Sequence, residues 1–139
     1  MRDIMSRMDV KRAIAPVSVA DNTAQVSQII DMQGNDALTF VILTGAIADV
    51  DATFTVLVEH GDAANLSDAA AVPDEQLIGT EVLAAFQFDD DNECRKIGYR
   101  GGRRYVRLTV TPVNNASAAL LAAVAVLRPT LMPPANPPV

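Results

Sequence analysis

The sequence alternates between apolar and polar residues over positions 105–111, which read YVRLTVT. In an extended chain, Val106, Leu108 and Val110 share one side, and the residues between them share the other. The stretch 53–60, TFTVLVEH, nearly repeats this pattern. Both stretches therefore predict strands of an antiparallel sheet that bury one face.

Further segments also carry strand signals. The apolar run 38–43, LTFVIL, is typical of a strand buried on both faces. Residues 94–100 predict a strand that pairs with 105–111 through Gly101-Gly102, because glycines accept the positive φ of a two-residue hairpin turn. Residues 118–127 mix alanine and leucine with valine, so they predict either a last strand or a helix. Weaker strand signals lie at 17–20, 25–31, 76–78 and 82–88.

About eight short strands predict an all-β fold, an antiparallel β-sandwich or barrel with extended N- and C-terminal arms. We divide the chain into an N-terminal arm (1–12), a sandwich domain (13–128) and a Pro-rich C-terminal tail (129–139). The last twelve residues hold five of the eight prolines. Proline removes hydrogen-bond donors and favours extended polyproline geometry, so the tail is not expected to join a sheet.

Charge is segregated along the chain. Residues 13–94 contain 15 acids and no Lys or Arg, whereas residues 95–107 contain six bases and no acid. Residues 1–12 are also net basic. Such segregation favours complementary poles that orient the protein against copies of itself or a shell. The alternative is that the two segments interleave in space and neutralise each other through cross-strand pairs.

Composition excludes several classes of protein. The chain has 139 residues, half of them apolar, and a net charge of −6, which is typical of one acidic globular domain. A single cysteine and a single histidine exclude an intrachain disulfide, a cysteine zinc cluster and a His-pair metal motif. The charged N-terminus is unlike a signal peptide, and the longest apolar run, 118–127, is about half a membrane span. We expect no cofactor and no membrane association.

Three motifs carry candidate chemistry, each with a structural alternative. His60 and Cys94 are the residue types of a base and a nucleophile, but no catalytic motif surrounds them, and we expect no enzymatic activity. Residues 89–93, DDDNE, suggest a cation loop, but Cys94 stands where an EF-hand needs glycine, which favours a solvated turn. Residues 100–105, RGGRRY, resemble a basic RNA-binding run. In an acidic chain this run is too short for a basic face, so direct nucleic-acid binding is not expected.

Five segments together resemble a known family of small proteins from tailed bacteriophages and prophages. They are VSQIID (26–31), LTFVI (38–42), ADVDATFTVL (48–57), RKIGY (95–99) and RYVRLTVTP (104–112). Members of this family are minor capsid or head-decoration (cement) proteins, and the resemblance spans residues 22–128. It implies a structural protein on the outer surface of the virion, made in the cytoplasm of the bacterial host.

The resemblance also implies partners. These are the major capsid protein, whose neighbouring subunits the protein would bridge, and copies of the chain itself. A homotrimer is expected by analogy with decoration proteins in general. A head–tail connector or tail-tube protein is the structural alternative, and a carbohydrate- or cation-binding β-sandwich module is the alternative of another class. The basic and methionine-rich segments supply the predicted capsid or protomer interface: Arg2, Met5, Arg7, Met8, Lys11, Arg12, Arg100, Arg103 and Arg104.

Overall fold

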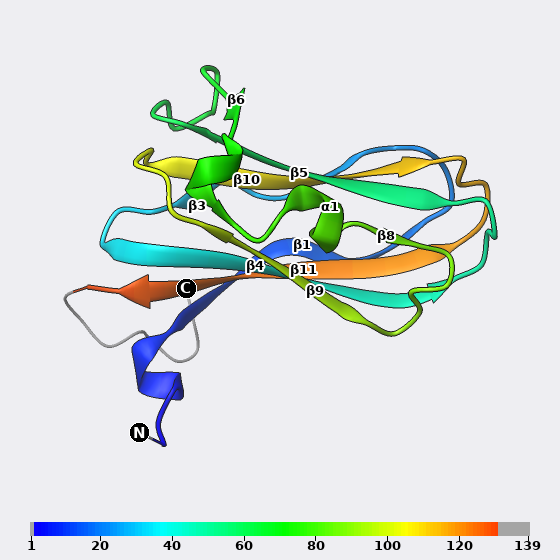
Figure 1. The fold of residues 1–139 in the computed structure, drawn as a ribbon, viewed down its shortest axis with the longest axis horizontal. Coiled ribbons are helices and arrows are strands. Elements are labelled where there is room, and N and C mark those ends of the chain that lie inside the picture. Colours follow the sequence, from blue (N-terminus) through cyan, green and yellow to red (C-terminus); the bar gives the residue numbers. More distant parts are fainter. Residues whose placement is uncertain (1, 131–139) are drawn as a thin grey trace.

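A computed structural model describes residues 2–130, which form two antiparallel sheets packed face to face (Figure 1). Sheet A has the order β1 (Asp9–Val19), β11 (Ala119–Pro129), β4 (Asn35–Ile47), β9 (Cys94–Tyr99) and β7 (Leu77–Ile78). Sheet B consists of β10 (Tyr105–Val113) and β5 (Thr53–Gly61), flanked by β2 (Gln25–Val26), β3 (Ile30–Asp31), β6 (Ala70–Ala71) and β8 (Phe86–Gln87). The predicted antiparallel β-sandwich is confirmed.

The alternation in β10 and β5 places the core between the sheets. Leu108 pairs with Val58, and both side chains are fully buried, as is Phe40 of β4 in the facing sheet. Phe54 stacks on Phe86 with ring centroids 4.7 Å apart. Burial of such side chains is the main favourable term in folding, so the two long strands of sheet B anchor the sandwich.

Residues 118–127, left open between strand and helix, form the strand β11 in the middle of sheet A. Its inward positions include Ala123 and Ala125, which are buried against the core. Its backbone is paired on both edges, with β1 on one side and β4 on the other. Ladders on both edges explain why alanine, a strong helix former, is held in a strand here.

The strand predicted at 38–43 exists, but the prediction that both its faces are buried is wrong. β4 buries every second side chain, including Leu38, Phe40 and Ile42. Leu43 points to the other side and is 52% exposed. An antiparallel strand in a two-layer sandwich has one face on the core, so its aliphatic outer positions remain uncovered.

The hairpin predicted at Gly101-Gly102 is also wrong. β9 pairs with β4 and β7 in sheet A, whereas β10 pairs with β5 in sheet B. Residues 100–104 therefore cross from one sheet to the other. The positive-φ glycines among the described residues are Gly34 and Gly79, so neither Gly101 nor Gly102 adopts the predicted turn conformation. Because consecutive strands of a sandwich often belong to different sheets, Gly101-Gly102 alone did not show how β9 and β10 are connected.

The arms are shorter than predicted. β1 begins at Asp9, and Lys11 and Arg12 pair with Ala125 and Val124 of β11, so the boundary at residue 12 is wrong. Without residues 9–12, this part of the edge of β11 would have unpaired backbone N–H and C=O groups. Before β1, the chain forms a short 3₁₀ helix, η1 (Met5–Arg7). The sandwich continues through Pro129, and predictions about the rest of the Pro-rich tail, 131–139, lie outside the described residues.

Two short helical elements sit between β6 and β8. They are η2 (Asp74–Gln76) and α1 (Glu81–Ala84), which replaces the first part of the strand predicted at 82–88. Thr80 caps α1 by accepting the Leu83 N–H at 3.1 Å, and Glu81 accepts the backbone N–H of Val58 at 2.8 Å. Helix α1 therefore covers part of the edge of β5. Within residues 2–130, none of the helices has the length and hydrophobicity needed to cross a membrane.

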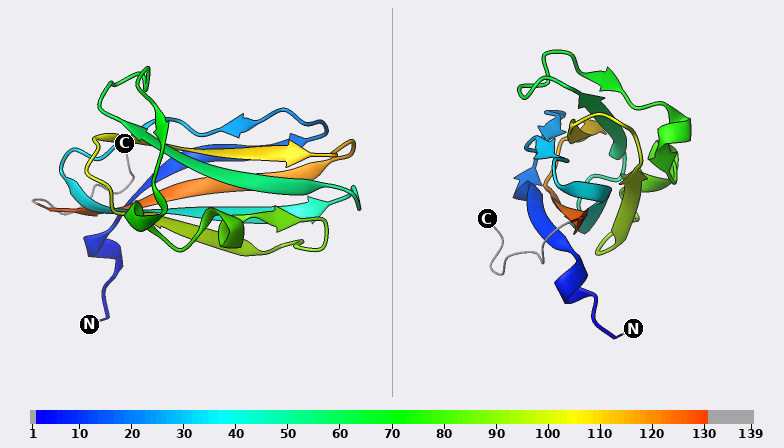
Figure 2. Two further views of the ribbon diagram at one scale, coloured as in Figure 1. Left: turned by 45° about the horizontal axis from the view of Figure 1, so that its top comes forward. Right: turned by 90° about the vertical axis from the view of Figure 1, so that its left-hand side faces the viewer.

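The strands of both sheets run close to the long axis of the molecule, so the connecting loops gather at its two ends (Figure 2). One end carries the loops 20–24, 48–52, 88–93 and 114–118. The other end carries the crossover 100–104, the last residues of β11 and the N-terminal segment. The molecule therefore has two loop-bearing ends and two outer sheet faces.

Candidate interaction surface

The outer face of sheet A is aliphatic. Cross-strand partners point to the same side of a sheet, so the pairing register defines this face row by row. We call it the sheet A face and define it by three rows. They are Val10, Val126, Thr39 and Gly98; then Arg12, Val124, Val41 and Lys96; then Ala122, Leu43 and Cys94.

Beside the third row, the sheet A face is hollowed. The hollow has a volume of ≈ 560 Å³ and is lined mainly by apolar side chains, including Pro16, Val17, Leu43 and Leu120. Gly45 contributes to its shape, because a Cβ at this position would lie 2.8 Å from the Cβ of Leu120. Leu120 is itself 46% exposed. An aliphatic hollow of this kind is a site at which another surface can be received.

The outer face of sheet B is different in chemistry. Thr55 and Thr111 face each other across β5 and β10. In the same ladder, Arg107 donates to Glu59 at 3.2 Å, so this pair of charges is neutralised within the chain. A threonine-rich, internally paired surface is well solvated without a partner. Leu57 and Val113 are also exposed in this ladder, at 37% and 43%. The hollow beside Leu43 and Leu120 distinguishes the sheet A face as a surface for contact with another protein.

The charges on the three rows of the sheet A face are two cations, Arg12 and Lys96. Both side chains are exposed, and within residues 2–130 neither forms an ion pair. They flank the exposed Val124 at either side of the sheet. The face therefore presents aliphatic surface between two positive charges.

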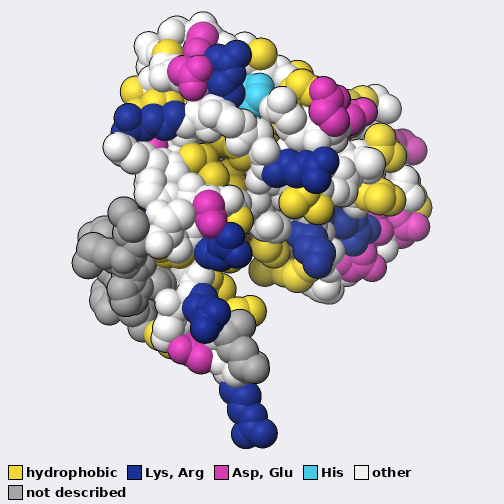
Figure 3. All heavy atoms as spheres, turned by 60° about the vertical axis from the view of Figure 1, so that its left-hand side comes forward, with side chains coloured by type: hydrophobic (Ala, Val, Ile, Leu, Met, Phe, Trp, Pro, Cys, Tyr) yellow, Lys and Arg dark blue, Asp and Glu magenta, His cyan; other side chains and the backbone are white. Residues whose placement is uncertain are grey.

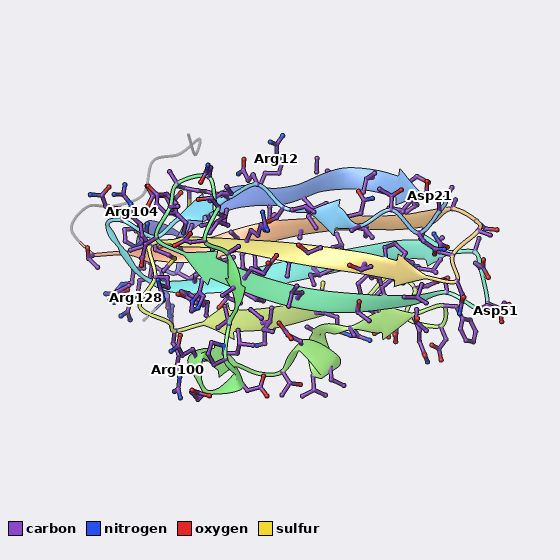
Figure 4. All side chains as sticks on the ribbon, turned by 90° about the horizontal axis from the view of Figure 1, so that it is seen from above. Arg12, Asp21, Asp51, Arg100, Arg104 and Arg128 are labelled. Atoms are coloured by element: carbon purple, nitrogen blue, oxygen red, sulfur yellow. The ribbon has the colours of Figure 1, made fainter. Side chains whose placement is uncertain are left out.

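The two ends of the sandwich differ in charge, as Figure 4 shows by the positions of Asp21 and Asp51 at one end and Arg100, Arg104 and Arg128 at the other. Loops 20–24, 48–52, 88–93 and 114–118 contain seven carboxylates and no Lys or Arg. We call this the acidic end, and the opposite one the arginine end. The acidic end is therefore a surface of one charge, apart from the ion pairs that Arg95 forms with Asp90 and Glu93.

At the arginine end, however, most of the arginines are paired with acids from the earlier segment. Arg103 contacts Asp62 at 2.7 Å, and Arg104 donates to both carboxylate oxygens of Asp31, at 2.9 and 3.0 Å. The hydrogen bond from Arg104 holds the pKa of Asp31 below its ordinary value. Figure 3 looks toward this end and shows Lys and Arg side chains beside Asp and Glu side chains. The alternative of interleaved, neutralising segments therefore applies here.

The same pairing extends to the last strand. Arg128 donates to both oxygens of Asp36, at 2.7 and 2.6 Å, and this hydrogen bonding lowers the pKa of that carboxyl. Arg100 is held differently, because its Nε donates to the carbonyl of Glu75 at 3.0 Å. Exposed ion pairs are worth little in stability, so these arginines neutralise charge more than they strengthen the fold.

The predicted interface residues divide into three groups. Arg2, Met5, Arg7 and Met8 lie in the N-terminal segment before β1, outside the sandwich. Arg12 lies on the sheet A face, and its neighbour Lys11 lies beside it on β1.

Arg100, Arg103 and Arg104 lie in the crossover at the arginine end. The N-terminal segment leaves the sandwich at this same end. Asp9, the first residue of β1, lies in the same row of sheet A as Tyr99, the last residue of β9, because Leu127 and Leu38 pair between them. The structure therefore brings the two predicted basic segments to one end, separated by the width of sheet A.

His60 and Cys94 are not brought together. His60 lies on β5 in sheet B, pairs with Val106 near the arginine end, and contacts Tyr99. Cys94 is exposed on β9 in sheet A, where it pairs with Leu43 toward the acidic end. A nucleophile and its base must lie within hydrogen-bond reach, so these two residues do not form a dyad.

The acidic turn 89–93 uses its carboxylates within the fold. Asp90 forms an ion pair with Arg95 at 2.8 Å, and Asp91 accepts the backbone N–H of Ile47 at 2.9 Å. Thr44 ties the same turn to β4 by donating to the Asp90 carbonyl and accepting from the Glu93 N–H. In the part of the chain that the structure describes, no group of three or more His, Cys, Asp or Glu side chains is arranged to hold a metal ion.

Comparison with known proteins gives structural matches to the fold. No protein-family model and no curated protein matches the sequence. The sandwich matches a chain from the capsid of Ralstonia phage GP4. That match covers 94% of this chain and 89% of the other, with a TM-score of 0.52 and 10% identity. At this identity, the likeness establishes a shared fold.

Two further solved structures give weaker matches. One is a chain of the cyanophage Pam1 capsid asymmetric unit, with a TM-score of 0.46, 15% identity, and coverage of 88% of this chain and 87% of the other. The other is a Clostridium thermocellum xylanase 10B structure with CBM22-1 and GH10 modules, with a TM-score of 0.46 and 9% identity. That match covers 94% of this chain but 28% of the xylanase chain.

Sequence reasoning missed most of the sheet A face. Of the residues in its three rows, Arg12 was among the predicted interface residues, but Leu43, Val124 and Lys96 were not. The available signal was the presence of large aliphatic residues at both alternating positions of 38–43 and 118–127. In an antiparallel sandwich that pattern indicates an aliphatic outer face, because only one side of each strand reaches the core.

Proposed function

We propose that the protein is a structural component of a tailed-bacteriophage virion that binds the outside of the head and reinforces contacts between neighbouring major capsid subunits. The sequence resemblance to head-decoration proteins supports this proposal, as does the fold shared with a phage capsid chain. The observation that carries it is the sheet A face. A monomeric protein in solution rarely exposes a continuous aliphatic surface, so this face is suited to being covered by a partner.

The proposed mechanism is cross-linking by many modest contacts. Each bound copy would hold adjacent subunits through the sandwich and through the N-terminal segment, which leaves the body at the arginine end. Linked contacts raise the effective affinity, and the symmetry of a head multiplies each of them. This role needs no catalytic residue.

Binding to heads tests the proposal. Heads that lack the protein are incubated with the purified chain, separated from unbound protein, and examined by quantitative gel electrophoresis and electron microscopy. Decoration gives a fixed ratio to the major capsid protein and density at many equivalent outer positions. No binding to heads would contradict the proposal.

Other outcomes favour the alternatives. Density confined to a ring at one vertex or to the tail would support a connector or tail-tube protein. Retention on a polysaccharide column, or a melting temperature that rises with calcium, would support the carbohydrate- or cation-binding module.

A further inference from the structure

One molecule carries two surfaces of complementary chemistry. The sheet A face is aliphatic and flanked by Arg12 and Lys96. The acidic end combines carboxylates with exposed apolar side chains. Val50 is 66% exposed between two aspartates, and Phe88 is 40% exposed beside Asp89. An apolar surface with cations therefore has its counterpart, an apolar surface with anions, on the same chain.

We propose that copies of this chain associate face to end, with the acidic end of one copy seated on the sheet A face of the next. Val50 and Phe88 would cover aliphatic surface beside Leu43 and Val124. The carboxylates around them would lie near Arg12 and Lys96 of the neighbouring copy. This inference concerns contacts between copies, so it goes beyond the proposed binding to heads and does not rest on it. It assigns the sheet A face to a neighbouring copy, which leaves the N-terminal segment and the rest of the sandwich for contact with the head.

Charge disfavours the two symmetric arrangements. If two sheet A faces packed together, Arg12 and Lys96 of both copies would enter one interface, and the rows that form it contain no acid. If two acidic ends packed together, five carboxylates from each copy that form no ion pair within residues 2–130 would face each other. Like charges brought together at an interface cost free energy and suppress such pairings. The face-to-end contact is the one in which opposite charges meet.

A face-to-end contact uses different surfaces on the two copies. Such heterologous contacts form a closed ring when the rotation between copies divides a full turn evenly, and otherwise extend into a filament. The expected homotrimer is one such ring. The contact would also cover the hollow beside Leu43 and Leu120, which lies on the side of the face nearest the loop 88–93 of its own chain.

Charge exchange between the two surfaces tests the proposal. The face variant carries Arg12→Glu and Lys96→Glu. The end variant carries Asp51→Lys and Asp89→Lys, whose carboxylates accept no hydrogen bond within residues 2–130. Asp49 is left unchanged, because its carboxylate accepts the backbone N–H groups of Asp51 and Ala116. The control variant, Arg2→Glu with Arg7→Glu, has the same change in net charge as the face variant but alters neither surface.

Sedimentation of the full chain measures association. We expect the wild type and the control variant to associate, and the face and end variants each to associate at least about tenfold more weakly, because each places like charges in the contact. The mixture should associate more strongly than either variant alone, because the substituted glutamates of the face variant meet the substituted lysines of the end variant. Alternation of the two variants permits pairs and even-numbered rings, so recovery of the full wild-type assembly is not required. Thermal melting confirms that each variant is folded, and Lys96→Glu alone replaces the face variant if it is not.

Two results would overturn the face-to-end contact. One is a wild-type chain that stays monomeric at every concentration measured. The other is an equimolar mixture of folded face and end variants that associates no more strongly than either variant alone, while the wild type associates. Binding to heads is scored separately, so failure of this contact and failure of the proposed function are distinguishable.

Discussion

The Nδ1 atom of His60 lies 2.9 Å from the hydroxyl oxygen of Tyr99, and this contact joins the two sheets. The same hydroxyl accepts the backbone N–H of Arg103 at 3.1 Å. In its contact with the hydroxyl, Nδ1 donates or accepts according to the tautomer of the neutral imidazole. The two rings meet edge to face, with centroids 5.6 Å apart. The histidine considered for catalysis is thus a structural link between β5, β9 and the crossover 100–104.

Stability should fall as the pH drops from 7 to 5. Burial lowers the pKa of His60 below its ordinary value of 6.5, so the unfolded chain takes up this proton at a higher pH than the folded chain. The stability that neutral His60 contributes is complete above pH 6.5 and is lost as the pH falls through the lowered pKa. Thermal melts at pH steps measure this slope. His60→Gln should flatten it, and an unchanged slope in that variant would contradict the assignment.

Removing the Tyr99 hydroxyl should destabilise the fold. Tyr99→Phe leaves a buried imidazole nitrogen and the Arg103 N–H without this partner, at a cost of about 1–3 kcal/mol. Denaturant unfolding measures the change. Tyr105→Phe is the matched control, because the Tyr105 hydroxyl has no hydrogen-bond partner within residues 2–130. Equal losses in the two variants would argue against the link.

The two glycines of the crossover should respond differently to alanine. A Cβ on Gly101 would lie 2.5 Å from the Tyr99 hydroxyl, whereas a Cβ on Gly102 would meet nothing within 4 Å. Gly101→Ala should therefore lower the melting temperature by several degrees, in line with an overpacking cost of about 1–3 kcal/mol. Gly102→Ala should leave it nearly unchanged. Equal melting temperatures for both variants would contradict this description of the crossover.

Asp49 should stabilise the acidic end, although that end is rich in carboxylates. Hydrogen bonds from the backbone N–H groups of Asp51 and Ala116 lower the pKa of its carboxyl below 3.8. Its contribution is present above pH 3.8 and is lost as the pH falls through the lowered pKa. Asp49→Ala should melt earlier than wild type at pH 7, whereas Asp51→Ala should not. If the melting temperatures of Asp49→Ala and wild type converge in acid, the lowered pKa of Asp49 is confirmed.

Truncations should separate the N-terminal segment from strand β1. Deleting residues 2–8 should leave the melting temperature within a few degrees of wild type and weaken binding to undecorated heads, with the wild-type advantage shrinking in high salt. Deleting residues 2–12 also removes pairing with β11 and should lower the melting temperature further. A large loss of stability on deleting 2–8 would show that this segment belongs to the core. Unchanged head binding would place attachment on the folded body.

The sequence predicted the fold class because alternation in 53–60 and 105–111 is a local signal that depends on one buried face. It did not predict which strands share a sheet. The Gly101-Gly102 dipeptide favours a turn but does not specify whether the chain stays in its sheet. That depends on the pairing of β9 with β4 and of β10 with β5, and each of these partners is distant in sequence. Lys11 and Arg12 look like part of a basic arm locally, and only pairing with β11 places them in a strand.

The candidate site was predicted less well than the fold. Charged residues stand out in a sequence, so the arginines of 100–104 were selected, yet Arg103 and Arg104 are paired with acids distant in sequence. The aliphatic outer positions of β4 and β11 resemble core residues until the layers are known. Their exposure is a property of the two-layer packing and could not be derived from either strand alone.

The positions of the first and last strands have a mechanical consequence. β1 and β11 are antiparallel neighbours, and Asp9 pairs with Leu127, so the chain enters and leaves the sandwich at adjacent points of the same end. Tension applied in opposite directions through residues 2–8 and 130 would load the hydrogen bonds of this ladder one after another, as in unzipping, and not all together, as in shearing. The edge strand β1 would peel from β11 before the core opened. A copy stretched between two neighbours would therefore yield first at this seam and keep sheet B intact.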